Sequence, residues 1–495
     1  MLRYTGHPLY DVGVATICAF VQKRDPAAIT EDNLHQVAMY IKESYSRDPL
    51  KSFLGVAFTT NAWFNQPAFD KQPEKRHHYA ERLLQSYRSE DRESTQRCAF
   101  TGGYVTTTAF SDKLPAGKAF RQHIPLLTGE GVINFHPDGN AGLPVSGLAA
   151  LCLQAFPLGC AKCGGRLLAV HSDNPDVTYY FAESFLRGNE AMLLLAQEAG
   201  ARKMPESKLT ARTMLIETFF RVERQRKAEN KRQRPASVTA YHLTNSGQSN
   251  PLDEQNPPLS MYHLPLELTN FLRIVTNNDL YKQQWNGIIA RAWQLQSSEK
   301  KTKHNERGED IRPKRNYLYE DLLRLPDTAA TFIRNYFLRL PVRKTAEENP
   351  KRSYSLREEG WLVSWRITAL FLREVMHMEK ERIEQIKALG ERLAAHIKEE
   401  NDRPFFESFY RETRRYEYLR NTLIKTSLAC VKRGKPPLIN LDTYITVFEE
   451  EDEVICSDWR LARDLVLIKM IEELYRLNWL SNNTDVADLR EEQEE

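Results

Sequence analysis

The sequence predicts an α+β fold, in which a large mixed N-terminal domain is followed by an all-α C-terminal helical bundle. Residues 1–345 alternate between helical and extended patterns, whereas from about residue 356 the apolar residues recur almost only at helical spacing. The 495 residues suffice for several domains, and 41% hydrophobic with 10% aromatic residues indicate a globular chain. A disordered chain would lack this apolar share.

Local signals in the N-terminal domain predict both kinds of element. Thr30 is suited to cap a helix. The segment from Val56 to Phe58 is typical of a short strand, and it leads into a polar and aromatic turn that ends at Pro67. Further along, the patterns predict strands at 167–170 and 238–243 and helices at 177–199 and from Thr210 onward.

The C-terminal residues predict an antiparallel helical bundle over 356–482, followed by an acidic tail over 483–495. Trp361 to Glu400 shows one long helical pattern, a second helix begins at Pro404, and Ser457 caps a third. Short connections between such helices favour the antiparallel arrangement.

The apolar runs and the cysteines of the sequence indicate the cellular compartment in which the protein is expected. The longest continuous apolar run, Leu148 to Phe156, is far shorter than the roughly 20 residues that cross a bilayer. Asp11 stands directly before the apolar run of the N-terminus, which argues against a signal peptide. Seven cysteines are an odd number, which disfavours a disulfide framework. The sequence therefore predicts a cytoplasmic protein.

Charge is segregated along the chain although the net charge is only +3. Residues 221–234 and 300–315 each carry seven basic side chains, and residues 411–435 carry eight against two acidic ones. Such clusters favour a polyanionic partner such as a nucleic acid. The alternative is that each run is an ordinary solvated helix face.

Familiar catalytic signatures are missing from the sequence. Gly117-Lys118 is followed by Ala119, where a P-loop needs serine or threonine, and neither HExxH nor GxSxG occurs. The chain is therefore predicted to be non-enzymatic. The alternatives are a metal-dependent nucleic-acid-processing enzyme, whose carboxylate or histidine cluster the sequence does not locate, and a protein-binding scaffold.

Two cysteine frames suggest a zinc-ribbon-like part over about residues 95–172. Cys160 and Cys163 form a CxxC turn followed by two glycines, and Cys98 begins a similar frame with Thr101 in place of the second cysteine. Cys98, Cys160 and Cys163 are therefore candidate zinc ligands, with His171 or a water as the fourth. The alternative is a metal-free remnant with reduced, packed cysteines.

The turn before Pro67 combines amides with aromatic rings. Asn61, Asn65 and Gln66 flank Trp63 and Phe64. Amides beside an aromatic wedge are suited to contact base edges or to separate bases. An ordinary capped turn with a buried tryptophan is the alternative.

Several short motifs follow one another along the chain. They are Tyr4-Thr5-Gly6-His7-Pro8-Leu9-Tyr10-Asp11-Val12-Gly13, the turn from Phe58 to Gln66, the cysteine frames, Ile124-Pro125-Leu126-Leu127 with Asn134-Phe135, and Tyr241 to Gly247. In this order they resemble the Cst1-type large subunit of type I-B CRISPR Cascade complexes. The similarity covers most of residues 1–340. The missing fourth cysteine departs from members that resemble complete zinc proteins.

The resemblance implies a non-enzymatic, DNA-binding and RNA-binding subunit of an antiviral defense complex. Such a subunit holds the guide-RNA 5′ end, recognises the protospacer-adjacent motif (PAM) in double-stranded DNA and stabilises the R-loop, while guide pairing selects the target. The expected partners also include the Cascade backbone and guide-end-capping subunits, helicase-nuclease or transposition proteins, and a small subunit made from the chain's own C-terminal region.

Residues can be assigned to these expected roles. For PAM and DNA binding the candidates are Asn61, Trp63, Asn65, Gln66, Lys118, Arg121 and Asn140. For binding the separated strands the candidates are Arg411, Arg414, Arg415, Lys432, Arg433 and Lys435.

Overall fold

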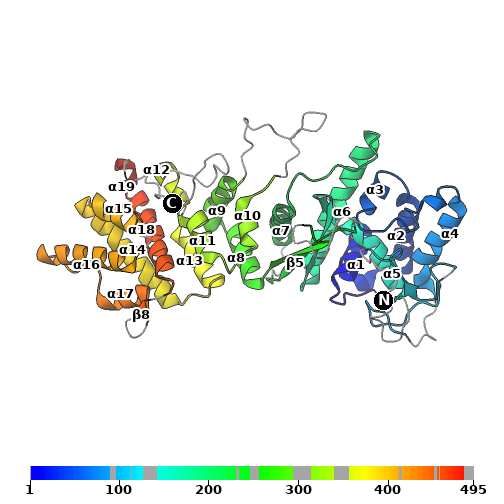
Figure 1. Ribbon diagram of the computed structural model, residues 1–495, viewed down its shortest axis with the longest axis horizontal. Helices are drawn as coiled ribbons and strands as arrows, with labels where there is room; N and C mark the ends of the chain where they lie inside the picture. Colours follow the sequence, from blue (N-terminus) through cyan, green and yellow to red (C-terminus); the bar gives the residue numbers. More distant parts are fainter. Residues whose placement is uncertain are drawn as a thin grey trace. The chain divides into compact units, whose positions relative to one another are not determined.

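The computed structural model shows a mixed α+β protein that is mainly helical (Figure 1). The residues it describes are 2–89, 96–112, 114–125, 142–229, 234–245, 256–293, 314–338, 356–411, 415–450, 454–455, 457–483 and 486. The chain divides into two compact units. The N-terminal unit comprises Met1–Thr269 and Asn305–Pro313, and the C-terminal unit comprises Asn270–His304 and Lys314–Glu495.

Helix α1 (Pro8–Phe20) forms the centre of the N-terminal unit. Every residue from Tyr10 to Ala19 is buried, and the helix packs against α5 (Gly147–Ala155), α6 (Pro175–Glu198) and the sheet. Gly13 lets α1 approach α5 closely, because a Cβ atom at this position would lie 2.1 Å from the carbonyl oxygen of Cys152. The close approach depends on a residue without a side chain.

Replacing Gly13 by alanine is expected to lower the free energy of unfolding of the N-terminal unit by about 1–3 kcal/mol, because the backbone of α5 has to move. Denaturant unfolding followed by circular dichroism measures this change. Gly188→Ala is the matched control. Gly188 lies inside α6 with nothing within 4 Å of its would-be Cβ, so alanine should stabilise the protein by about 1 kcal/mol. Equal effects of the two substitutions would contradict the packing argument.

The main sheet of the N-terminal unit is antiparallel with strand order β3-β4-β5-β6. Its strands are β3 (Ala161–Cys163), β4 (Arg166–Ser172), β5 (Val238–Leu243) and β6 (Leu259–Leu264). The strands predicted at 167–170 and 238–243 are confirmed, as are the helices predicted at 177–199 and from Thr210. A shorter antiparallel pair joins β1 (Lys118–Ala119) to β2 (Leu143–Pro144).

The remaining helices of the N-terminal unit are α2 (Glu31–Ser44), α3 (Leu50–Leu54), α4 (Pro73–Leu84), α7 (Ala211–Ala228) and the start of α8 (Leu266–Asn277), with short η helices at Pro26–Ala28, Pro67–Phe69, Ser86–Arg88 and Phe156–Gly159.

The predicted strand from Val56 to Phe58 is wrong. The amide groups of Val56, Ala57 and Phe58 bond back to the carbonyls of Phe53 and Leu54 at the end of α3. The segment is therefore a helical turn. By contrast, the predicted cap is confirmed, because the Thr30 side chain accepts a hydrogen bond from the Asn33 amide at the start of α2.

The C-terminal unit is built from helices around the pair α14 (Lys380–Glu400) and α18 (Trp459–Arg476) (Figure 1). The other elements are α9 (Asp279–Arg291), α10 (Tyr317–Leu322), α11 (Ala329–Phe332), the π-helix η6 (Ile333–Leu338), α12 (Leu356–Glu359), η8 (Gly360–Leu362), α13 (Trp365–Glu374), α15 (Arg403–Arg411), α16 (Tyr416–Lys432), α17 (Leu441–Phe448), α19 (Trp479–Asn482) and the strand pair β7 (Glu449–Glu450) and β8 (Val454–Ile455). None of the helices described in either unit combines the length and the apolar character needed to cross a bilayer.

The long helical patterns predicted in this unit are interrupted. The pattern from Trp361 to Glu400 breaks between α13 and α14, where His377 has a positive φ of 52°. The helix predicted from Pro404 is likewise two helices, α15 and α16. Ser457 precedes the cap, and the N-cap position of α18 belongs to Asp458.

The two compact units divide near Thr269, whereas the helical pattern of the sequence predicts a domain boundary after residue 345. The reason is a shared aromatic core around Phe371 of α13. Its ring contacts Phe271 of α8 and Phe332 of α11 with centroids 5.4 Å apart, and Phe337 of η6 at 5.3 Å. Segments on both sides of residue 345 therefore bury one core.

Candidate functional site

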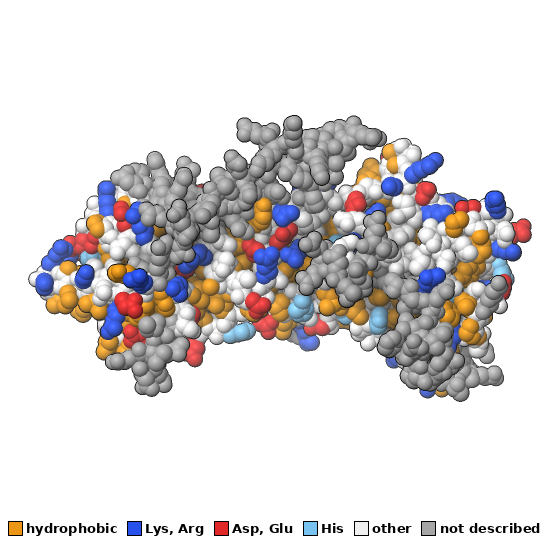
Figure 2. Space-filling model, in the orientation of Figure 1, with side chains coloured by type: hydrophobic (Ala, Val, Ile, Leu, Met, Phe, Trp, Pro, Cys, Tyr) orange, Lys and Arg blue, Asp and Glu red, His pale blue; other side chains and the backbone are white. Residues whose placement is uncertain are grey.

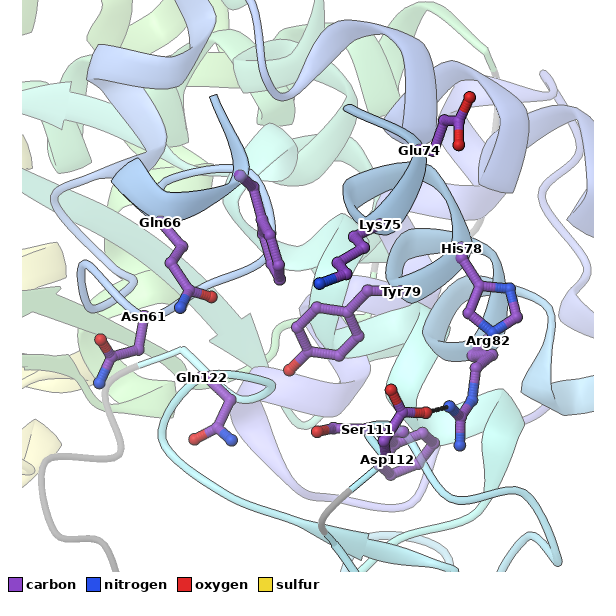
Figure 3. Close-up of a pocket in the computed structure, with 12 residues that line it drawn as sticks. Asn61, Gln66, Glu74, Lys75, His78, Tyr79, Arg82, Ser111, Asp112 and Gln122 are labelled. Carbon is purple, nitrogen blue, oxygen red and sulfur yellow. Dashed lines mark hydrogen bonds and ion pairs between the residues drawn. The ribbon is translucent and has the colours of Figure 1, made fainter. Parts of the chain in front are cut away.

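A cavity of about 640 Å³ lies in the N-terminal unit between α4 and two loop segments (Figure 3). One loop is the turn over 59–66 with the following η2 helix (Pro67–Phe69), and the other part contributes residues from 110–112 and from 114–122. The residues that line the cavity are Asn61, Gln66, Phe69, Glu74, Lys75, His78, Tyr79, Arg82, Phe110, Ser111, Asp112 and Gln122.

The turn is anchored by Trp63, which is only 1% exposed. Its indole Nε1 donates a hydrogen bond to Oε1 of Gln154 at 3.1 Å, and its ring stacks on Tyr45 with centroids 6.3 Å apart. A ring held in the core cannot enter a DNA groove, so the assignment of Trp63 to DNA binding is corrected. The buried-tryptophan alternative describes this residue.

Asn61 and Gln66, on either side of the anchored tryptophan, face the cavity (Figure 3). Asn61 is exposed and Gln66 is half-buried. Within the part of the chain that the structure describes, neither side-chain amide has a hydrogen-bond partner. Both amides are therefore free to bind a ligand through one donor group and one acceptor group each.

Tyr79 of α4 supplies an aromatic ring whose position is fixed by hydrogen bonds. Its hydroxyl lies 2.7 Å from Nε2 of His123. Nδ1 of His123 accepts a hydrogen bond from the Phe120 amide at 3.0 Å, so the imidazole hydrogen is on Nε2 and is donated to the Tyr79 oxygen. Burial lowers the pKa of His123 to about 3, which keeps the ring neutral near pH 7.

The hydroxyl of Tyr79 also interacts with the side chain of Gln122. Burial raises the pKa of Tyr79, while the hydrogen bond with Gln122 and the charge of Arg82 act in the opposite direction. The phenol is therefore neutral at physiological pH. Phe69 packs against the same ring with centroids 6.0 Å apart. These contacts hold the ring in place without a ligand.

Gln154 of α5 joins the two sides of this arrangement and is completely buried. Its Oε1 accepts the Trp63 hydrogen bond, and its Nε2 donates to the carbonyl of His123 at 2.6 Å. The main-chain carbonyl of Gln154 accepts a hydrogen bond from the Tyr45 hydroxyl at 2.6 Å. One buried glutamine thus fixes the turn that carries Asn61 relative to the loop that carries Gln122.

Charged side chains complete the cavity. Arg82 pairs with Asp112, and its Nε donates to the Ala109 carbonyl at 3.0 Å, so this arginine is committed to the wall. Lys75 and His78 are exposed on α4. Among the described residues Lys75 has no ion-pair partner, and Figure 3 shows its ammonium group directed toward the ring of Tyr79. Lys75 is the cation that a ligand can reach.

The structure brings together only some of the predicted PAM residues. Asn61 and Gln66 share the cavity, whereas Asn65 does not line it. The carbonyl of Arg121 accepts a hydrogen bond from Thr59 at 3.5 Å, so Arg121 lies beside the turn. Lys118 is half-buried in β1, opposite Pro144 of β2. Asn140 lies outside the described residues.

Sequence reasoning missed Lys75, Tyr79, Gln122 and the supporting pair His123 and Gln154. A partial signal existed, because Lys75, Tyr79 and Arg82 recur at helical spacing and so share one face of α4. Nothing in the sequence relates that face to the turn over 59–66, because the connection is made by Gln154, which lies 91 positions from Trp63.

The three predicted zinc ligands do not converge. Cys98 begins a tight turn in which its amide bonds to the Gly103 carbonyl, whereas Cys160 directly precedes β3 and Cys163 is the last residue of that strand. The Cys160 thiol donates to the Phe156 carbonyl at 3.2 Å, Cys163 lies 3.7 Å from Nε2 of His242, and His171 pairs with Asp11. Within the described ranges, no three His, Cys, Asp or Glu side chains could hold one metal ion.

Burial also disfavours the thiolate form that zinc requires. It raises the pKa of Cys160 and raises that of Cys163 to about 12. The described residues do not fit a zinc site, and they do not form a ribbon-like insertion. We expect far less than one zinc per chain in protein purified without chelators, measured by plasma mass spectrometry. Stoichiometric zinc that is lost in Cys160→Ser and Cys163→Ser variants would contradict this.

The predicted strand-binding residues lie in the C-terminal unit. Arg411 and Lys432 are exposed, whereas Arg433 pairs with Glu400 at 2.6 Å and Lys435 pairs with Glu399 at 2.7 Å. Arg415 lies over the ring of Tyr418, and Arg414 is outside the described residues. Two of the expected cations are thus already compensated by carboxylates.

The surface around α16 nevertheless remains rich in basic side chains. Arg420, Lys425 and Lys432 are exposed on this helix, beside the exposed apolar residues Ile424 and Leu428. Figure 2 shows Lys and Arg side chains gathered over α16, with hydrophobic side chains next to them.

Comparison of the chain with protein-family models, curated proteins and solved structures finds no match.

Proposed function

We propose that this chain is the non-enzymatic large subunit of a type I-B CRISPR Cascade surveillance complex. In this role it recognises the PAM in double-stranded DNA, holds the guide-RNA 5′ end and stabilises the R-loop. Two features support the proposal. One is the order of the short sequence motifs in residues 1–340, and the other is the cavity that Asn61 and Gln66 line together with Tyr79 and Lys75.

The cavity supports nucleic-acid recognition because its parts match those that proteins use for bases. Side-chain amides of Asn and Gln can form paired hydrogen bonds to base edges, and a lysine can neutralise a phosphate. The segment that carries both amides is also one of the motifs on which the resemblance rests. Lys118 and Arg121 remain the proposed phosphate contacts, and Asn61 and Gln66 the proposed base contacts.

Strand binding is proposed for the basic surface around α16. Arg411, Arg414, Arg415 and Lys432 remain the residues assigned to it, and Arg433 and Lys435 pair with carboxylates. Contacts of this kind are electrostatic and tolerate sequence variation. The proposal needs no metal ion.

The packing of Phe371 bears on the proposed small subunit. A product that starts between residues 350 and 370 would lack Phe271, Phe332 and Phe337, which contact the Phe371 ring in the full chain, and one that starts between residues 372 and 380 would lack Phe371 as well. A stable small subunit therefore has to cover this apolar surface by packing on another subunit. Such a product is proposed only as a component of the assembled complex.

Binding of a guide-loaded complex to target duplexes tests the proposed function. The complex should bind a complementary target tightly next to some flanking sequences and weakly next to others, and omission of this chain should abolish the difference. Binding that ignores the flanking sequence would contradict the proposal. Turnover of nucleic acid by the isolated chain would favour the enzyme alternative, and assembly without any effect on DNA binding would favour the scaffold.

A further inference from the structure

The shape of the cavity bears on the state of the base that Asn61 and Gln66 contact. A base pair in a duplex offers only its groove edges, because both of its faces are covered by stacking. Reading such an edge requires side chains that project into a groove. Here Gln66, Gln122 and Tyr79 are half-buried in the walls of a cavity of about 640 Å³, a volume typical of small-molecule sites. A recessed site of this size suits one nucleotide.

The aromatic ring points to the same ligand. Tyr79 is held by His123 at 2.7 Å and packed by Phe69, so it is positioned before any ligand arrives. An aromatic ring in a recess contributes to nucleic-acid binding by stacking on the face of a base, which is accessible only when that base is unpaired. Hydrogen bonds that fix the phenol serve this purpose without using the ring face.

Polar side chains lie around the Tyr79 ring, where they can contact the edge of a stacked base and the phosphate of the same nucleotide. Figure 3 shows the Tyr79 ring with Lys75 on one side and the amides of Gln122 and Gln66 on the other. The amides of Asn61 and Gln66, which have no hydrogen-bond partner among the described residues, can bind the edge of a base that stacks on the ring. The Lys75 ammonium, which has no ion-pair partner within the same ranges, can bind its phosphate. Arg82 and Asp112 pair with each other in the wall, and Glu74 also lines the cavity, so the contact to a phosphate is assigned to Lys75 locally and not to a net positive charge of the site.

We infer that this cavity binds one unpaired nucleotide, with its base stacked on Tyr79, its edge held by Asn61 and Gln66, and its phosphate on Lys75. The inference rests on the proposed function, which it deepens. The nucleotide has two sources in such a complex, a DNA base released beside the PAM by strand separation and a base at the guide-RNA 5′ end. Both present the same chemistry to the site.

The test uses full-length chain and three fluorescent probes. The first is a DNA hairpin with a single extrahelical 2-aminopurine, the second is the same hairpin fully paired, and the third is a hairpin RNA with one unpaired 2-aminopurine at its 5′ end. Wild-type protein should bind the first or the third probe about 5- to 100-fold more tightly than the paired hairpin, and stacking should quench the 2-aminopurine. The probe that is preferred identifies the source of the nucleotide.

Variants separate stacking, edge contacts and charge. Tyr79→Leu should abolish both the preference and the quenching, whereas Tyr79→Phe keeps the ring and should retain most of the quenching. Lys75→Ala, at an exposed position that tolerates substitution, should weaken binding of the unpaired probes about 3- to 10-fold. Lys71→Ala is the control, because Lys71 is exposed nearby but does not line the cavity.

Two results would overturn the inference. One is equal affinity of wild-type protein for paired and unpaired probes, and the other is a preference that survives both Tyr79→Leu and Lys75→Ala. If that happens while the guide-loaded complex still discriminates flanking sequences, the inference fails and the proposed function stands. A Tyr79-dependent preference in a complex that ignores flanking sequence would show a nucleotide site and refute the proposed function.

Discussion

Replacing Trp63 by alanine is expected to lower the free energy of unfolding of the N-terminal unit by about 3–5 kcal/mol, the range for large buried aromatic residues. The substitution leaves a cavity beside Tyr45 and Phe64, and it also leaves Oε1 of buried Gln154 without its donor. Because Gln154 connects the turn to His123, the positions of Asn61 and Gln122 should loosen together. Denaturant unfolding followed by tryptophan fluorescence and circular dichroism measures the loss.

Two further variants test whether the loss of stability comes from the anchoring role of Trp63. Trp63→Phe keeps an aromatic ring and removes only the indole donor and part of the volume, so its cost should be clearly smaller. Trp361→Ala is the matched control, because Trp361 is 38% exposed in the C-terminal unit. A Trp63→Ala protein as stable as Trp361→Ala would refute the anchoring role.

Acid should destabilise the N-terminal unit through His123. Burial lowers its pKa to about 3, whereas an unfolded histidine titrates near 6.5. The folded state therefore binds fewer protons between these values, and the stabilisation present above pH 6.5 is lost as the pH falls toward 3. Between pH 7.5 and pH 5 the loss from this group should be about 2 kcal/mol.

A comparison with His123→Gln isolates this contribution from the carboxylates that also titrate in acid. The variant should be less stable at pH 7.5, and its stability should fall less between pH 7.5 and pH 5, by about 2 kcal/mol. The measurement is the free energy of unfolding of both proteins across this range. Parallel curves for the two proteins would show that His123 is not kept neutral by burial.

Local signals in the sequence predicted several elements well. Thr30 stands directly before a helix and caps it, and Val238 to Leu243 has the pattern of a strand and forms β5. These features depend on neighbouring residues, so a single sequence contains the information. Val56 to Phe58 has the same apolar character, but its amides bond to the end of α3, which local propensity did not indicate.

The site and the division into units depend on contacts between distant residues. The amides Asn61 and Gln66 were predicted from their turn, whereas Tyr79 and Gln122 enter the site only through tertiary packing. In the same way, Phe371 joins helices before and after residue 345, which an inspection of helical texture could not show. The two cysteine frames suggested one zinc site because their spacing is similar. Each frame forms its own turn, however, and these turns do not bring Cys98 to Cys160 and Cys163.

The most direct test of the proposed function measures PAM discrimination by a guide-loaded complex that contains the Asn61→Ala, Gln66→Ala double variant. Target duplexes that differ only in the flanking sequence are titrated against wild-type and variant complexes, with Lys71→Ala as the control. Loss of each base contact is worth about 1–3 kcal/mol, so the double variant should reduce the preference for the best flanking sequence by at least about tenfold. Wild-type discrimination that persists unchanged in the double variant would contradict the account.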